Sequence, residues 1–226
     1  MARRYGIYFA PDAAAPLWQR ASAWLGRDAA AGAVAADIPG LPEGRTGLMA
    51  SAIRYGFHAT LKAPMVLGPD VTEAELGARV AALARTLAPV SLGPLQVADL
   101  DGFLALVPEG ERPGLVDLAA RVVTELDDLR APLSAEDRAR RGPLDPRAAE
   151  LLETWGYPHV LERFQFHMTL TDRVSDEIRP GIRRAAENWF AGLGETVLDR
   201  LVIFTEDAPG AAFVRGPEFP FPRDAK

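Results

Sequence analysis

The chain has 226 residues, no cysteine, a formal net charge of -6 and a hydrophobic content of 48%. This apolar content suffices for a substantial core and argues against disorder, while the lack of cysteine excludes disulfides, thiolate zinc sites and cysteine nucleophiles. The acidic balance argues against broad, non-specific binding to nucleic acid, which requires a basic surface, and leaves a short RNA end as the one nucleic-acid partner to consider.

The first residues lack the long apolar core and cleavage site of a secretory leader. No segment approaches the length that spans a membrane. We therefore expect a cytoplasmic protein without membrane contacts. The oligomeric state cannot be predicted from the sequence.

Hydrophobic periodicity divides the first part of the chain into alternating strands and helices. In chain order we expect a strand over 5–9, a helix over 14–25, a strand over 56–66, a helix over 72–87 and a strand over 90–97. The second helix opens with Thr72 and Glu75, which have the spacing of a capping box. A loop rich in glycine and proline runs from the first helix to residue 47.

The same order of elements begins again at residue 103. We expect a strand over 103–107, a helix over 115–129, a strand over 164–171, a helix from Ser175 to about 190, a strand over 197–204 and an edge strand over 212–215. An insertion over 131–163, rich in proline and arginine, separates the first helix of this half from its next strand. Its length and composition suit a lid over a cleft, and a plain surface excursion is the alternative.

The repeated order of strand, helix, strand, helix and strand indicates an internal duplication, longer than the repeats of solenoid proteins. We predict an α+β fold in which residues 1–226 form a single domain with two lobes, over about 1–100 and about 101–226. Two antiparallel sheets would face each other across a central cleft, with the helices packed outside.

A pentapeptide occurs twice with little change, once in the second strand of each half. It reads Phe57-His58-Ala59-Thr60-Leu61 and, 109 residues later, Phe166-His167-Met168-Thr169-Leu170. Only three histidines are present, so two of them stand in one repeated frame. Because alternate residues of a strand share a face, each histidine points the same way as the threonine two positions later. Two such strands side by side would aim two imidazoles and two hydroxyls into one cleft.

These residue types suit metal-independent phosphodiester chemistry. Histidine titrates near neutral pH, so one imidazole can act as a base while the other, still protonated, acts as an acid. Threonine hydroxyls can donate hydrogen bonds to phosphoryl oxygens as charge builds on them. The histidine spacing fits no zinc motif, the glycine-rich segments fit no nucleotide-phosphate loop, and no nucleophile elbow is present, so we predict neither a metal nor an organic cofactor.

The paired His-x-Thr motifs on strands of a duplicated lobe resemble those of the 2H phosphoesterase superfamily, and the order of elements matches over nearly the whole chain. Segments 54–62, 155–158 and 164–171 resemble more closely a bacterial subfamily commonly encoded among phosphonate-degradation genes. The resemblance implies that His58 and His167 are the acid and base pair and that Thr60 and Thr169 hold the phosphoryl oxygens. It implies a small cyclic sugar or nucleotide phosphate as substrate and leaves the order of the two histidine roles open.

Five further residues are candidates for substrate binding: Tyr8, Arg54, Lys62, Arg163 and Thr171. Lys62 shares the face of His58 if the strand stays regular, and Thr171 has the corresponding place in the second copy. A solvated lysine at the strand end is the alternative for Lys62. Arg54 and Arg163 precede the two motif strands, where arginine offers a bidentate fork to a phosphate.

The sequence therefore predicts a metal-independent phosphodiesterase of the 2H type. One alternative is an enzyme that opens or ligates 2′,3′-cyclic RNA ends, which a basic stripe beside the cleft would favour. Another is a non-catalytic sensor of a phosphorylated metabolite, although a pure binding protein has no need of an acid and base pair.

Overall fold

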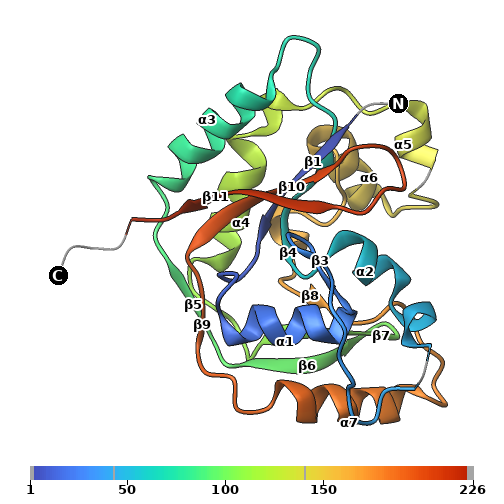
Figure 1. The fold of residues 1–226 in the computed structure, drawn as a ribbon. Helices are drawn as coiled ribbons and strands as arrows, with labels where there is room; N and C mark the ends of the chain where they lie inside the picture. The colour runs from blue at the N-terminus through green and yellow to red at the C-terminus, as the bar shows by residue number, and fades with distance from the viewer. Residues whose placement is uncertain (1–2, 43, 140, 223–226) are drawn as a thin grey trace.

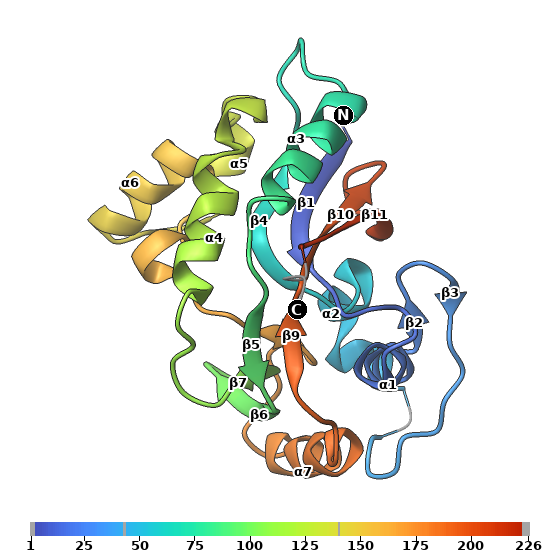
Figure 2. The same ribbon diagram turned by 90° about the vertical axis from the view of Figure 1, so that its left-hand side faces the viewer.

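The computed structural model of the chain describes residues 3–42, 44–139 and 141–222. Strands and helices alternate along the chain, and Figures 1 and 2 show them from two sides. In chain order the elements, with 3₁₀ helices written η, are β1 (Arg4–Phe9), α1 (Pro16–Leu25), β2 (Arg27–Asp28), β3 (Gly32–Ala33), η1 (Arg45–Leu48), α2 (Ala50–Tyr55), β4 (Ala59–Met65), α3 (Glu73–Ala84), β5 (Val90–Gly93), β6 (Leu95–Leu100), β7 (Phe103–Pro108), α4 (Leu115–Thr124), η2 (Asp127–Leu129), α5 (Ala135–Ala139), α6 (Pro146–Trp155), η3 (Leu161–Arg163), β8 (Met168–Thr169), α7 (Arg179–Phe190), β9 (Thr196–Leu198), β10 (Arg200–Glu206) and β11 (Val214–Pro220).

Two antiparallel sheets form the frame of the molecule. The first has the strand order β11-β10-β1-β4 and the second β6-β7-β8, with the short pairs β5-β9 and β2-β3 beside them. Helices α3 and α4 pack on strands of the first sheet, and α7 packs on β6 and contacts α1. In Figure 1, α3 and α4 lie beside the upper sheet, and α1 and α7 lie beside the lower one. The predicted α+β class with two antiparallel sheets is confirmed.

Each of the two sheets combines strands from both halves of the chain, an exchange of strands between the halves. Strands β1 and β4 come from the first half of the chain, but their sheet is completed by β10 and β11 from the second half. Conversely, β7 and β8 from the second half pair with β6 from the first. A division at about residue 100 therefore separates the two sequence repeats, whereas the sheets do not divide there.

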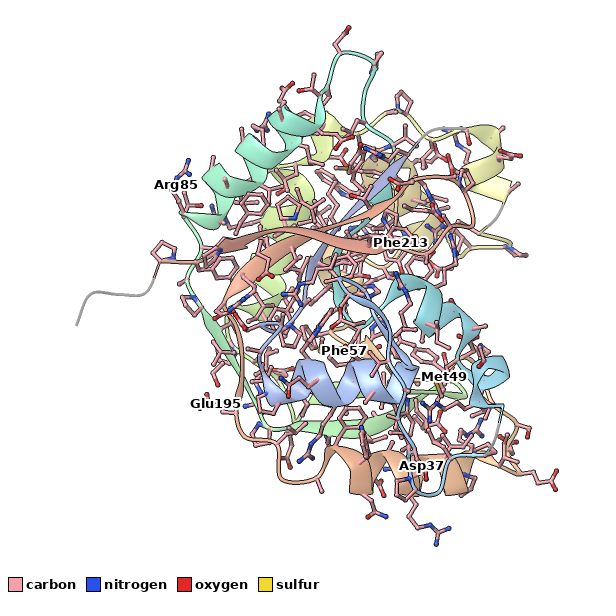
Figure 3. The ribbon with its side chains drawn as sticks, in the orientation of Figure 1. Asp37, Met49, Phe57, Arg85, Glu195 and Phe213 are labelled. Carbon is pink, nitrogen blue, oxygen red and sulfur yellow. The ribbon has the colours of Figure 1, made fainter. Side chains whose placement is uncertain are left out.

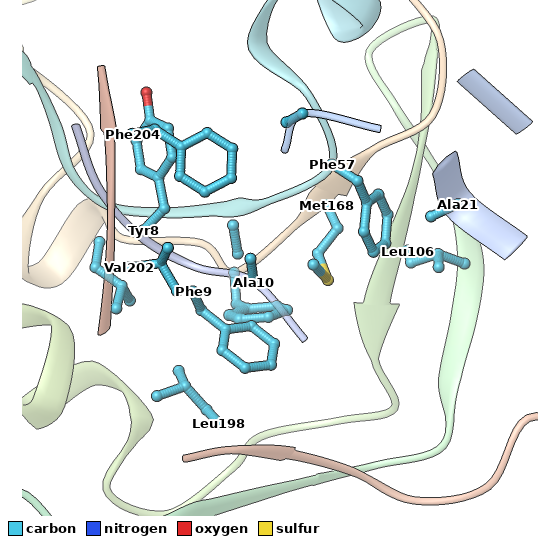
Figure 4. Close-up of a cluster of buried hydrophobic side chains, with 14 of the residues drawn as sticks. Tyr8, Phe9, Ala10, Ala21, Phe57, Leu106, Met168, Leu198, Val202 and Phe204 are labelled. Carbon is cyan, nitrogen blue, oxygen red and sulfur yellow. The ribbon is translucent and has the colours of Figure 1, made fainter. Parts of the chain in front are cut away.

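One hydrophobic core connects the two sheets. It includes Phe57 and Phe166, which precede the two motif histidines, and Leu61 and Met168 from the motif strands. The ring centroids of Phe9 and Phe166 lie 6.1 Å apart. Figure 4 shows part of this core, and in Figure 3 the side chain of Phe57 lies in the interior. Because the apolar residues of both motifs belong to this one cluster, the two motif strands are held in a fixed relation.

Several elements differ from the expected ones, and local chemistry explains most of the differences. The strand expected over 90–97 is split into β5 and β6 at Gly93, which has a φ of 65°. The helix expected from Ser175 begins at Arg179 with a proline in its first turn, and no side chain caps it. The capping bond expected at Thr72 is present, since its hydroxyl accepts from the Glu75 amide at 3.1 Å.

The insertion over 131–163 is not a plain loop, because it contains α5 and α6. The Asp145 carboxylate caps α6 by accepting hydrogen bonds from the amides of Arg147 and Ala148. Among the described residues, no helix combines the length and the apolar character that crossing a membrane requires.

Candidate active site

The first motif lies where α2 ends and β4 begins. Gly56, with a φ of 76°, follows the last residue of α2, and a side chain there would meet the Cβ of Ala29 at 2.7 Å. After this turn, His58 Nδ1 lies 2.8 Å from the Gly56 carbonyl oxygen, and Nε2 lies 3.2 Å from the Thr60 hydroxyl. Thr60 pairs with Tyr8 across β1 and β4, so both side chains lie on the same face of the sheet.

The second motif repeats this geometry in the other sheet. His167 Nδ1 lies 2.9 Å from the carbonyl oxygen of Gln165, again two residues earlier in the chain. Thr169 pairs with Ala105 of β7, as Thr60 pairs with Tyr8 of β1. Because a carbonyl oxygen only accepts hydrogen bonds, Nδ1 carries the proton in both imidazoles. When such a ring is neutral, its Nε2 carries the lone pair that can take up a proton, and in His58 this atom contacts the Thr60 hydroxyl.

A cavity of about 220 Å³ brings the two motifs together. His58 and Thr60 of the first motif and Thr169 of the second line it, with Tyr8 beside them. His167 stands two residues before Thr169, with its ring against the edge of Phe103 at 5.8 Å. The charge on His167 affects the pKa of His58, so the imidazoles lie within electrostatic reach of each other.

Aromatic rings surround the His58 imidazole. The Tyr8 ring stacks on it with centroids 3.9 Å apart, and the Phe204 ring lies 5.9 Å away. Burial among these rings lowers the pKa of His58 to about 4; the charge on His167 acts in the same direction, and the hydrogen bond to Gly56 opposes it. His58 is therefore neutral at pH 7, the state in which it can accept a proton.

Tyr8 is buried, and its hydroxyl is the unusual feature of the cavity. The hydroxyl oxygen has no hydrogen-bond partner among the described residues. Burial raises the pKa of the Tyr8 phenol well above its ordinary value, so the group remains a hydrogen-bond donor. Its ring lies over Gly6, two residues earlier on β1, where an added Cβ would meet Tyr8 Cζ at 2.4 Å. Glycine at this position makes room for the ring that stacks on His58.

A β-bulge in β4 places Lys62 away from His58. Tyr8 pairs with Thr60 and Ile7 with Lys62, so Leu61 is an extra residue in β4. Beyond the bulge, Lys62 shares the face of Ile7 and not the face of Thr60. There its Nζ donates to Asp127 Oδ1 at 2.7 Å and to the Val123 carbonyl at 3.1 Å. The regular alternation that would have put Lys62 beside His58 does not hold.

Three other predicted binding residues have partners elsewhere. Thr171 is fully buried, and its hydroxyl accepts from the Leu104 amide at 2.9 Å. Arg163 forms an ion pair with Asp145 at 2.6 Å, within the insertion. Arg54 forms an ion pair with the buried Glu206 and lines a second cavity of about 790 Å³. Of the five candidates, only Tyr8 lines the cavity of the motifs.

Several other residues that line this cavity were not predicted from the sequence: Ser51, Tyr55, Arg141 and Tyr157. Tyr55 ends α2 just before the first motif, whereas Arg141 and Tyr157 belong to the insertion. Three of the four tyrosines of the chain line this one cavity. Scarce aromatic residues close to the motif or in the insertion were the signal that could have identified the two tyrosines.

Comparisons with known proteins show which family the chain resembles. Residues 60–214 match the model of a family described as a protein of unknown function, DUF1045. The chain is 40% identical over 229 aligned positions, 96% of its length, to the ribose 1,5-bisphosphate phosphokinase PhnN of Janthinobacterium sp. (strain Marseille). It is 39% identical over 211 positions, 93% of its length, to the protein of the same name from Laribacter hongkongensis (strain HLHK9). It spans about half of these relatives, 51% and 50% of their lengths.

A solved structure shows the same fold. The crystal structure of E. coli LigT complexed with 3′-AMP aligns with a TM-score of 0.50, over 99% of this chain and 100% of LigT, at 14% sequence identity.

The burial of His58 generates a prediction about its protonation. Because desolvation disfavours the charged imidazole, the NMR signal of His58 Cε1–H should shift only below about pH 5, with a midpoint near 4. A His58→Asn variant identifies the signal. A midpoint near the ordinary value of about 6.5 would contradict the desolvated environment.

The contact between Gly6 and Tyr8 generates a second prediction. Gly6→Ala should displace the Tyr8 ring from His58 and reduce thermal stability, with overpacking costing about 1–3 kcal/mol. The matched control is Gly77→Ala in α3, where an added Cβ meets nothing within 4 Å and helix propensity improves. An unchanged melting temperature for Gly6→Ala would show that the ring can move without cost.

Proposed function

The chain belongs to the DUF1045 family, and on that premise we propose that it is a metal-independent phosphodiesterase that hydrolyses a small cyclic phosphodiester. The repeated motif geometry carries the proposal. In both copies the backbone carbonyl two residues earlier holds the proton on Nδ1, so that Nε2 is the nitrogen that can exchange a proton with the substrate or water. Two imidazoles prepared in this way form an acid and base pair once one of them is protonated.

In the proposed mechanism, His58 Nε2 takes a proton from a water molecule as its oxygen attacks phosphorus. The bond between phosphorus and one ring oxygen breaks, and His167 donates its proton to that oxygen. The hydroxyls of Thr60 and Thr169, one from each sheet, donate hydrogen bonds to the non-bridging oxygens. The neutral state of His58 at pH 7 supports its role as the base that begins the reaction.

The relatives suggest a ribose phosphate as substrate. The chain matches half of proteins named for phosphorylating ribose 1,5-bisphosphate. Hydrolysis of the 1,2-cyclic phosphate of ribose 5-phosphate, with cleavage of the bond to O2, would produce that compound. We therefore propose that this chain opens a ribosyl cyclic phosphate in phosphonate breakdown and that a kinase consumes the product.

Removing either histidine tests the chemistry. His58→Ala and His167→Ala should each reduce kcat by about 10²- to 10⁴-fold, because general acid and base catalysis contribute that much. Phosphorus NMR of chelator-treated protein with ribose and nucleotide cyclic phosphates and with cyclic-ended RNA measures the turnover, and circular dichroism checks that the variants fold. Turnover of RNA ends alone would favour the RNA alternative. Binding without turnover by the unmodified protein would favour a sensor, and full activity in both variants would refute the assignment.

Tyr8→Phe tests the buried hydroxyl. Because this hydroxyl has no partner in the free protein, its removal should leave stability unchanged or slightly raised. The value of kcat/KM should fall about 10-fold, the cost of one hydrogen bond to substrate. The control is Tyr5→Phe on the same strand, since Tyr5 does not line the cavity. Equal effects on activity from both substitutions would exclude a substrate contact by Tyr8.

A further inference from the structure

The insertion places one arginine in the cavity that contains His58. The guanidinium carbon of Arg141 lies 4.8 Å from the centroid of the Tyr157 ring, and both residues line this cavity. Arg141 also lines the neighbouring larger cavity, so it stands where the two adjoin. Burial raises the pKa of the Tyr157 phenol, which therefore adds no negative charge beside the guanidinium.

The other cationic residues that line these cavities are each paired with a carboxylate. Arg4 and Arg54 both pair with Glu206. Lys62 and Arg130 both pair with Asp127. Within the described ranges, Arg141 forms no ion pair with an acidic residue. Its positive charge is therefore available to an anion that enters the cavity.

We propose that Arg141 and Tyr157 form a second anion-binding subsite, which takes a phosphomonoester of the substrate remote from the reacting diester. This inference rests on the proposed function, because it assumes that His58, Thr60 and Thr169 hold the diester. The planar guanidinium offers paired donors that match phosphate oxygens. Stacking on Tyr157 limits its orientations, which reduces the entropy lost on binding. A ribosyl cyclic phosphate that carries a 5-phosphate has both groups, a diester that reacts and a phosphomonoester remote from it.

The subsite predicts a preference that one substitution removes. The unmodified protein should hydrolyse ribose 1,2-cyclic phosphate 5-phosphate with a kcat/KM about 10- to 100-fold above that for the same compound without the 5-phosphate, the range expected for a hydrogen bond to a charged group. In Arg141→Gln the ratio of the two values should fall to within about threefold of unity. Arg141→Lys should recover part of it, since lysine keeps the charge but lacks the fork.

The matched control is Arg138→Gln, on the same segment. Arg138 pairs with the exposed Glu153 at 2.7 Å and lines neither cavity. The Arg138→Gln variant should retain the ratio of the two kcat/KM values found for the unmodified protein. An equal loss of the ratio in both variants, or an unchanged ratio in Arg141→Gln, would overturn the subsite.

A binding measurement separates this inference from the proposed function. Ribose 5-phosphate has no diester, so its calorimetric affinity does not depend on turnover. Weaker binding to Arg141→Gln than to the unmodified protein and to Arg138→Gln would support the subsite even if no cyclic phosphate were hydrolysed. Equal affinities for all three proteins would refute it, whatever the outcome for hydrolysis.

Discussion

The pairing of each motif strand with the central strand of its sheet is the constraint on which the site depends. Thr60 is fixed opposite Tyr8, and Thr169 opposite Ala105. The apolar residues between them enter a single core, so the hydroxyls cannot move apart without disrupting that core. The two threonines are thus positioned by sheets rather than by loops, and rigid elements of this kind position reacting groups well.

The duplication does not make the two histidines equivalent. Tyr8 stacks on His58, whereas the residue in the corresponding place beside the second motif is Ala105. The Tyr8 ring stacks on His58 with centroids 3.9 Å apart, whereas the Phe103 ring meets His167 edge to face at 5.8 Å, so the imidazoles have different surroundings. The two copies of one motif thus share a backbone geometry but have different neighbours, and a reaction with one acid and one base needs two groups that differ.

The sequence was sufficient for the order of elements, the duplication and the motif face, because apolar alternation and helical periodicity are local properties. It was not sufficient for Lys62, since a bulge shows no periodic signal and turns Lys62 to the opposite face from Thr60. The exchange of strands between the halves was also hidden. A repeat in the sequence does not tell whether β6 and β10 pair with strands of their own half or of the other half. The insertion was interpreted as a lid or a surface excursion, but Arg141 and Tyr157 were not singled out, because a loop-rich segment has no periodicity that tells which of its side chains face the cavity.

The strand exchange also affects synthesis of the chain on the ribosome. Strand β1 lies between β4 and β10, so one of its edges has no partner until β10, about 190 residues later, has emerged. Contacts between distant parts of a chain form slowly, and an unpaired strand edge is a template for association with other chains. The nascent first half therefore carries an open edge that β10 covers, so the pairing of β10 with β1 both completes this sheet and protects that edge from association with other chains.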